Sequence, residues 1–294
     1  MSTHHSHSHD ASVSIGTAFF LNLAFTIIEV IGGFLTNSLA ILSDSLHDLG
    51  DSFSIGLSWY MEGRARRPGK GPYSYGYRRL SLLAALINAV VLLAGSIFIL
   101  SRAIPRLIEP EHADPGGMLA LAILGILVNG AAVLRLRGGK TMNARMIAWH
   151  LLEDVLGWVA VLIVSISLLI TDFHILDPLL SILITCYILY NVVRNLRKTL
   201  AIFLQAAPPE LDLHALDHAL GSIDGVLSTH HTHAWSLDGE HHVLTTHLVV
   251  PAGATKAQVI SVKKAALGLL AQADLEHTTV EIEYEDEDCR MRKG

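Results

Sequence analysis

The sequence predicts a membrane protein in which an all-α bundle of six transmembrane helices is followed by a small α+β domain. Hydrophobic residues make up 51% of the 294-residue chain and the mean hydropathy is positive, which is high for a soluble protein. The excess lies in long apolar runs, and from Pro208 onward charged residues recur regularly, as in soluble domains. We therefore expect a flexible histidine-rich tract over residues 1–12, a transmembrane domain over residues 13–204 and a small globular domain over residues 205–294.

Six apolar stretches are each long enough to cross the roughly 30 Å of hydrocarbon in a bilayer. Basic residues gather between the second and third stretches, between the fourth and fifth, and after the sixth. Because cytoplasmic loops carry an excess of Lys and Arg, both termini are expected in the cytoplasm of a multi-pass protein, in the inner membrane if it is bacterial. The stretches cover residues 13–35, 38–61, 80–104, 117–136, 144–171 and 176–200, and the basic residues are Arg64, Arg66, Arg67, Lys70, Arg78, Arg79, Arg135, Arg137, Lys140, Arg145, Arg194, Arg197 and Lys198.

The pattern His-x-x-x-Asp occurs twice within these apolar stretches, as His47 with Asp51 and as His150 with Asp154. The i, i+4 spacing places both side chains on one face of a helix. A carboxylate at the bilayer centre costs about 2.5–3.5 kcal/mol on insertion scales, so such residues indicate function. If the two faces meet, their two imidazoles and two carboxylates form a four-coordinate site suited to zinc. Counting residues from the cytoplasmic ends places Asp51 and Asp154 at the same depth, roughly 15 Å, where transporters commonly bind substrate.

The two histidines and two carboxylates also suggest how a metal could be exchanged for protons. Two Asp charges cancel the charge of the ion, whereas an empty site with two buried negative charges would attract protons. Imidazole titrates close to physiological pH, and metal binding must displace the protons held by its ligands. The residues therefore favour the hypothesis of a secondary active transporter that moves Zn²⁺ across the membrane in exchange for protons.

Three alternatives remain open from the residues. Cd²⁺, Co²⁺, Ni²⁺, Mn²⁺ and Fe²⁺ can also take nitrogen and oxygen ligands. A membrane metalloenzyme would use a zinc-bound water, but four protein ligands leave no open coordination position. A metal sensor would bind metal in the tail without moving it across the membrane. Transport is the preferred interpretation, with lipid, divalent metal ions and protons as partners, and we expect no enzymatic activity, organic cofactor or nucleic-acid partner.

Three further carboxylates accompany the two motifs. Asp44 precedes His47 by three positions and can lie near the same helix face, as a hydrogen-bond acceptor or an entry ligand. Asp48 follows His47 directly, and Glu153 precedes Asp154 directly, so each points away from its neighbour by about 100°. Hydrogen bonds to neighbouring helices are at least as good an interpretation of these two as metal binding.

The region after Pro208 predicts a small ferredoxin-like α+β domain. Its elements follow in the order helix, strand, strand, helix, strand, which suggests one sheet with helices on one face. The turn Asp238-Gly239 joins the first two strands as a hairpin. The expected helices cover residues 209–221 and 255–273, and the expected strands cover residues 226–237, 241–250 and 277–285.

Histidine and glutamate side chains give this sheet a second candidate metal site. Strict alternation places His231 and His233 on one face of the first strand and His230 on the other. Solvated polar strand faces are the alternative interpretation. The candidate ligands are His230, His231, His233, His247, Glu281 and Glu283.

The remaining histidines and the cysteines carry less information. The N-terminal tract has a metal-binding composition and either concentrates metal at the pore mouth or is dispensable. Cys186 and Cys289 are too few and too poorly placed for a disulfide framework and receive no role. The histidines of the tract are His4, His5, His7 and His9.

Together these motifs resemble the cation diffusion facilitator family, most closely its bacterial zinc exporters and animal zinc transporters. The resemblance covers essentially the whole chain after the N-terminal tract. The matching segments are Asn37 to Asp44 leading into His47 and Asp51, Tyr75 to Arg79, Leu83 to Asn88, His150 to Gly157, Asp177-Pro178 with Ser181, His230 to Trp235, and His247.

The resemblance implies a homodimeric six-helix exporter that moves Zn²⁺ out of the cytoplasm and has a metallochaperone-like cytoplasmic regulatory domain over residues 205–294. Zinc bound there as a regulatory ligand would bring two cytoplasmic domains together. Histidine as the first ligand of the second span is similar to the zinc-preferring branch. Two features depart from the family: Ser81 stands where many members carry Glu, and the loop between the fourth and fifth spans lacks a histidine-rich insertion. The family's transport ligands fall on His47, Asp51, His150 and Asp154, and its tail ligands on His230, His247, Glu281 and Glu283.

Overall fold

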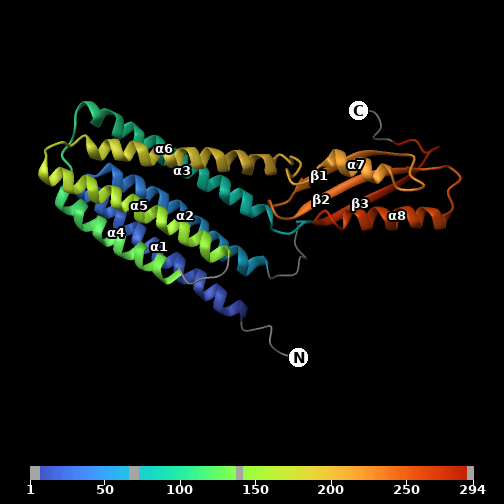
Figure 1. Ribbon diagram of the computed structural model, residues 1–294, viewed down its shortest axis with the longest axis horizontal. Coiled ribbons are helices and arrows are strands. Elements are labelled where there is room, and N and C mark those ends of the chain that lie inside the picture. Colours follow the sequence, from blue (N-terminus) through green and yellow to red (C-terminus); the bar gives the residue numbers. More distant parts are fainter. Residues whose placement is uncertain (1–6, 66–72, 137–141, 290–294) are drawn as a thin grey trace. The chain divides into compact units, whose positions relative to one another are not determined.

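The computed structural model describes residues 7–65, 73–136 and 142–289 (Figure 1). The chain divides into two compact units, residues 1–67 with 84–196 and residues 68–83 with 197–294. The first unit is built from long helices, and the ends of two of these helices belong to the second unit. The helices are α1 (His7–Thr36), α2 (Leu39–Ala65), α3 (Arg79–Ile108), α4 (Pro115–Leu136), α5 (Met142–Ile170) and α6 (Leu176–Phe203).

Five of these helices are long and apolar enough to cross a membrane within the described residues: α1, α3, α4, α5 and α6. The helix outside this group is α2, which carries Asp44, Asp48 and Asp51 along its middle. Among these carboxylates only Asp51 is a predicted transport ligand, and all three lower the apolar content of α2. A sixth span therefore stays a prediction.

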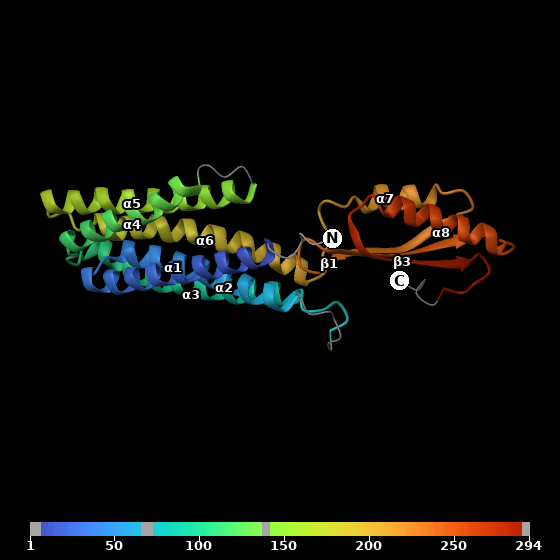
Figure 2. The ribbon, with the colours of Figure 1, turned by 90° about the horizontal axis from the view of Figure 1, so that it is seen from below.

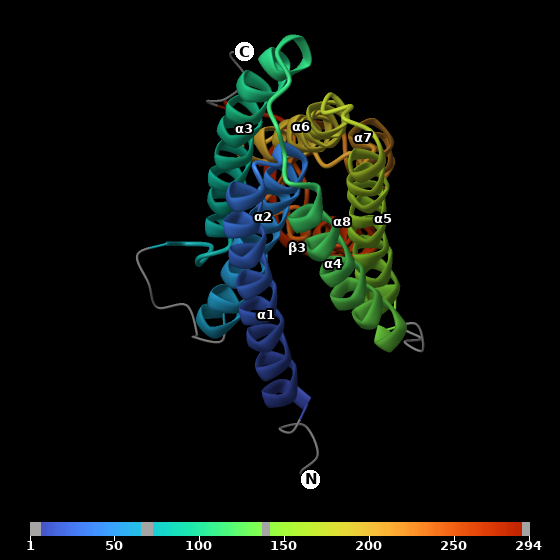
Figure 3. The ribbon, with the colours of Figure 1, turned by 90° about the vertical axis from the view of Figure 1, so that its left-hand side faces the viewer.

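Apolar side chains from α1, α2, α4 and α5 form the main core of the first unit. Trp158 of α5 is almost completely buried and packs flat on Gly125 of α4, where an added Cβ would lie 2.3 Å from the indole Cδ2. Figure 3 shows α4 beside α5 and α1 beside α2, in agreement with their contacts. The buried cluster consists of Phe25, Ala40, Ile41, Ala113, Met118, Ala122, Trp158, Val161 and Leu168.

Asp177, at the start of α6, holds the beginning of α2. One carboxylate oxygen accepts hydrogen bonds from Ser38 Oγ at 2.5 Å and from the backbone N–H of Ala40 at 3.3 Å, and the other accepts from the N–H of Leu39 at 2.8 Å. The first N–H groups of a helix have no partner within the helix, so this carboxylate satisfies them. Because Asp177 and Ser38 are buried, the contact fixes one end of α2 on α6.

The second unit contains a three-stranded sheet with order β1-β2-β3, in which β1 and β2 are antiparallel and β2 and β3 are parallel. Figure 2 shows α7 and α8 on the same face of this sheet. Leu244 and Leu248 of β2 pack against these helices with Leu220 and Val262. The elements are α7 (Leu213–Gly221), β1 (Ser228–Ser236), β2 (His242–Val250), α8 (Lys256–Leu270) and β3 (Leu275–Tyr284).

The predicted small α+β domain, with its order of helices and strands, is confirmed. Helix α7 begins later than expected because Asp212 is its N-cap and accepts a hydrogen bond from the N–H of Ala215 at 3.0 Å. Helix α8 begins after Thr255, which forms a capping box with Gln258.

A β-bulge in β1 overturns the predicted alternation of its histidines. His230 pairs with His247 and His233 pairs with Thr245, so an extra residue lies on β1 between these pairs. His231 takes up the irregularity with a φ of 51°. The prediction that His230 and His231 lie on opposite faces is therefore wrong, because their ring centroids lie 5.2 Å apart and both approach the ring of His247.

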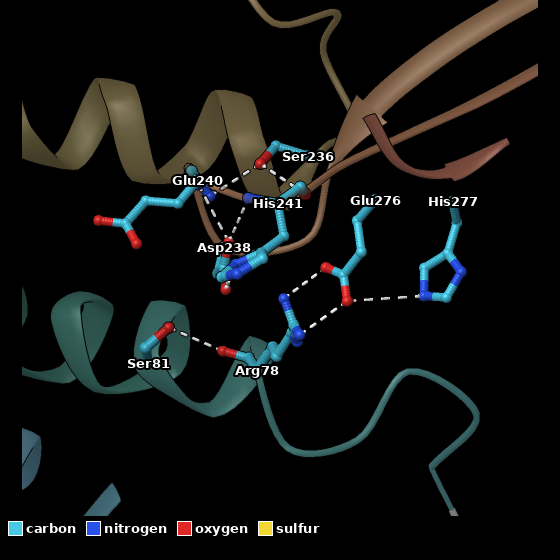
Figure 4. A network of polar contacts seen from close by, with 9 residues as sticks. Arg78, Ser81, Ser236, Asp238, Glu240, His241, Glu276 and His277 are labelled. Carbon is cyan, nitrogen blue, oxygen red and sulfur yellow. Dashed lines mark hydrogen bonds and ion pairs between the residues drawn. The ribbon is translucent and has the colours of Figure 1, made fainter. Parts of the chain in front are cut away.

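Two polar networks order the second unit (Figure 4). The guanidinium of Arg78 donates to both carboxylate oxygens of Glu276, at 2.5 and 2.7 Å, which holds the start of α3 on β3. In the β1–β2 turn, Asp238 accepts hydrogen bonds from the N–H groups of Glu240 and His241 at 3.0 and 2.9 Å. Burial acts to raise the pKa of Asp238, but these donors and the His241 ring outweigh it and hold the pKa below its ordinary value.

Candidate metal centres

Side chains from α2 and α5 converge on one point inside the first unit. Asp51 Oδ2 lies 2.8 Å from His150 Nε2 and 3.7 Å from His47 Nε2. The ring centroids of the two histidines are 5.7 Å apart. One ligand atom from each of the three side chains lies within 4.8 Å of the others. The structure therefore brings three of the four predicted transport ligands into one group, with the nitrogen and oxygen donors that zinc accepts.

Asp154 lies one helical turn beyond His150 on α5 and is outside this three-residue group. The prediction that Asp51 and Asp154 share one depth is wrong by about a turn, because Asp51 lies opposite His150. Counting from the ends of apolar runs does not determine the offset between two helices, which side-chain packing sets. The role of Asp154 as the fourth ligand stays a prediction.

Two further acidic residues of α2 are buried in the first unit. Asp44 faces α5, since a Cβ added at Gly157 would lie 3.5 Å from Asp44 Oδ1. This agrees with the expected placement of Asp44 near the face of His47. Asp48 is also buried, and its backbone carbonyl accepts a hydrogen bond from the Asn22 side chain at 3.2 Å.

A second group of candidate ligands lies on the face of the sheet opposite α7 and α8. Glu283 bridges two histidines: its Oε1 lies 2.6 Å from His247 Nδ1 and its Oε2 lies 3.1 Å from His230 Nε2. His247 and Glu283 are both buried. Burial acts to raise the pKa of Glu283, but its contacts with His247, Cys289 and His230 outweigh it and hold the pKa below its ordinary value.

The remaining predicted tail ligands lie at the edge of this group. Glu281 Oε2 lies 3.4 Å from His247 Nε2, but the Glu281 side chain is 57% exposed. The rings of His231 and His233 are 6.0 Å apart, and His231 approaches His247 with a centroid distance of 5.5 Å. Neither histidine belongs to the four-atom group that the structure brings together.

Sequence reasoning missed Cys289. Its sulfur lies with ligand atoms of His230, His247 and Glu283 within a mutual distance of 4.8 Å. No sequence signal marked this position, because Cys289 follows the last strand and reaches the group only through the turn after β3. Of the N-terminal histidines, His4 and His5 fall outside the described residues, and the side chains of His7 and His9 do as well.

The fold and both groups of ligands fit a metal transporter, and comparison with known proteins identifies the class. Residues 15–204 match the family model of the cation efflux transmembrane domain, and residues 208–285 match that of the cytoplasmic domain of cation efflux proteins. The chain belongs to the cation diffusion facilitator family. It is therefore an integral membrane protein for metal cation efflux, in a family of transporters rather than enzymes.

Individual relatives match over nearly the whole chain. The chain is 33% identical to the zinc transporter ZitB of Escherichia coli strain K12, over 99% of this chain and 96% of that protein. It is 30% identical to the cadmium, cobalt and zinc/H(+)-K(+) antiporter of Bacillus subtilis strain 168, over 96% of this chain and 92% of that protein. It is also 30% identical to the metal cation efflux system protein CzcD of Cupriavidus metallidurans, over 96% of this chain and 90% of that protein.

Proposed function

We propose that this protein exports Zn²⁺ from the cytoplasm in exchange for protons, through a site formed by His47, Asp51, His150 and Asp154. The observation that carries the proposal is the convergence of His47, Asp51 and His150 from two different helices, with ligand atoms within 4.8 Å of one another. The membrane domain would have six spans, with α2 as the polar one. Both termini would lie on the cytoplasmic side, in the inner membrane if the protein is bacterial.

The packing of α2 against α5 supports Asp154 as the fourth ligand. Asp51 lies opposite His150, and Asp44 lies opposite Gly157. The two contacts are seven residues apart on each helix, so the helices run antiparallel with a constant offset. With that offset, Asp154 would lie at the level of His47. A rotation of its side chain would then complete a tetrahedral shell of two nitrogens and two oxygens.

The ligand types favour zinc. Imidazole nitrogen and carboxylate oxygen suit Zn²⁺, whereas Mg²⁺ and Ca²⁺ prefer shells of oxygen. Cadmium and cobalt accept similar ligands. Export of these two ions is the second candidate, favoured by the name of the B. subtilis relative.

The contact between His150 and Asp51 supports the exchange for protons. His150 Nε2 and Asp51 Oδ2 lie 2.8 Å apart, a separation at which two proton-free acceptor atoms would repel each other, so the pair is favourable only when it holds a proton. A divalent cation that takes both atoms as ligands must displace that proton. Metal uptake from the cytoplasm then releases protons, and protons that arrive from the other side of the membrane compete with the ion for the same atoms.

The cytoplasmic domain would act as a regulatory module. Its family is named for dimer formation in zinc transporters, which supports a homodimer. Zinc held by His230, His247 and Glu283 would stiffen the face of the sheet and tighten the contact between two such domains. A protein with His247→Ala is then expected to lose metal-dependent tightening of the dimer, measured by the distance between fluorophores on the two cytoplasmic domains.

Flux measurements in proteoliposomes test the transport proposal. Zinc entry and internal pH are followed with two dyes, and zinc movement in one direction should accompany proton movement in the other. Asp51→Ala should abolish flux, whereas Glu153→Ala, which removes an exposed carboxylate of α5, should retain it. Flux that persists in Asp51→Ala would overturn the site, and zinc flux without a pH change would overturn the proton coupling. A pure sensor would show no flux in any variant.

A further inference from the structure

The chain turns back after β3 and carries Cys289 to the metal-binding face of the sheet. The N–H of Glu285 still donates to the carbonyl of Val250 at 2.9 Å, which extends the pairing with β2. A turn follows, in which the N–H of Glu287 donates to the carbonyl of Tyr284 at 2.9 Å and the Glu287 carboxylate accepts from the N–H of Tyr284 at 3.0 Å. Figure 2 shows this segment running back on the side of the sheet opposite α7 and α8.

We propose that the thiolate of Cys289 is the fourth ligand of the cytoplasmic metal site, with His230, His247 and Glu283. The proposal rests on the regulatory site described above and changes its chemistry from nitrogen and oxygen ligands alone to a site that contains sulfur. The carrying observation is that ligand atoms of all four side chains lie within 4.8 Å of one another.

The geometry favours Cys289 over Glu281 as the residue that completes the shell. Glu281 is on the same strand as Glu283, but 57% of its side chain is exposed and its carboxylate lies at the edge of the group. Cys289 approaches Glu283 closely enough to hydrogen bond with it. Thiolate is a preferred zinc ligand, and Glu283 and a Cys289 thiolate together cancel the two charges of the ion.

A sulfur ligand has two consequences for the chain. The site would favour thiophilic ions such as Zn²⁺ and Cd²⁺ over Mn²⁺, because soft thiolate selects soft metals. Metal binding would also attach the segment after β3 to the sheet, since the ion would join Cys289 to ligands on all three strands of the domain: His230 on β1, His247 on β2 and Glu283 on β3.

Cobalt substitution tests the sulfur ligand directly in the full-length protein. Co²⁺ bound to a thiolate gives an intense sulfur-to-metal charge-transfer band in the near ultraviolet, and the transport site, whose proposed ligands include no sulfur, cannot produce it. We expect the band in the parent protein, its loss in Cys289→Ser and its retention in Cys186→Ser, which removes the other cysteine of the chain. Absence of the band in cobalt-loaded parent protein, or its persistence in Cys289→Ser, would overturn the proposal.

Thiol alkylation provides a second measurement that does not depend on cobalt. Zinc at 100 times its dissociation constant should slow the reaction of Cys289 with iodoacetamide by about 100-fold, because only the metal-free fraction reacts. His247→Ala should remove this protection, and an unchanged alkylation rate with zinc in the parent protein would contradict the proposal. The regulatory site itself would survive that result if zinc still tightens the dimer, so the two failures are distinguishable.

Discussion

Removal of the Asp154 carboxylate should weaken zinc binding as much as removal of the Asp51 carboxylate. Four-ligand zinc sites bind with about 10–16 kcal/mol, so an equal share for each ligand is roughly 2.5–4 kcal/mol. That share corresponds to a weakening of about 10²–10³-fold in the dissociation constant. Asp154 lies outside the three-residue group, and its role depends on the offset that the contacts of Asp51 with His150 and of Asp44 with Gly157 give to α2 and α5.

Isothermal titration with zinc measures this loss. A background that combines His247→Ala with alanine at His4, His5, His7 and His9 removes the cytoplasmic site and the histidine tract, so that the titration reports the transport site. Asp154→Ala and Asp51→Ala should then show similar losses, and Glu153→Ala should bind like the background protein. If Asp154→Ala binds normally while Asp51→Ala is weakened, then the reasoning from the helix offset is refuted and the site has three protein ligands.

Three further changes test the packing around the sites. Gly125→Ala places a Cβ 2.3 Å from the Trp158 indole and should destabilise the membrane unit by about 1–3 kcal/mol in thermal unfolding, whereas Gly130→Ala, with open space at the same helix, should not. Asp177→Ala leaves the start of α2 without its hydrogen-bond acceptor and should lower the unfolding temperature. Each buried group that loses its partner lowers the free energy of unfolding by about 1–3 kcal/mol. The ionised Asp238 carboxylate stabilises the β1–β2 turn at pH values above 3.8, its ordinary pKa, and this stabilisation is lost as the pH falls through the lowered pKa of the folded protein. Asp238→Ala should therefore make the free energy of unfolding depend less steeply on pH in acid. An unchanged pH profile of stability would contradict this.

The fold was largely predictable because hydrophobic burial imposes simple patterns. Apolar runs of sufficient length predicted the positions of α1 to α6, and alternation with turn residues predicted the strands and helices of the cytoplasmic domain. The i, i+4 spacing correctly placed His47 and Asp51 on one helix face, and it marked His150 as their partner on α5. These signals are local, so they survive without knowledge of tertiary packing.

The features that escaped prediction depend on contacts between distant segments. The offset between α2 and α5 follows from interhelical packing. Residue counting therefore aligned Asp51 of α2 with Asp154 of α5, whereas the structure aligns it with His150, one turn away. The bulge at His231 requires a positive φ, which a histidine in the sequence does not predict. Cys289 joins its group because a turn after β3 reverses the chain, and an acidic run followed by a cysteine gives no sign of that reversal.

The hydrogen bonds from Ser38, Leu39 and Ala40 to Asp177 fix the start of α2, so that α2 can tilt about this end. From Leu39 to Asp51 the helix rises about 18 Å, so a tilt of about 10° about its fixed end displaces the Asp51 carboxylate by roughly 3 Å. Metal–ligand bond lengths tolerate only about 0.2 Å of change. A tilt of α2 by about 10° is therefore enough to disrupt the coordination of the ion.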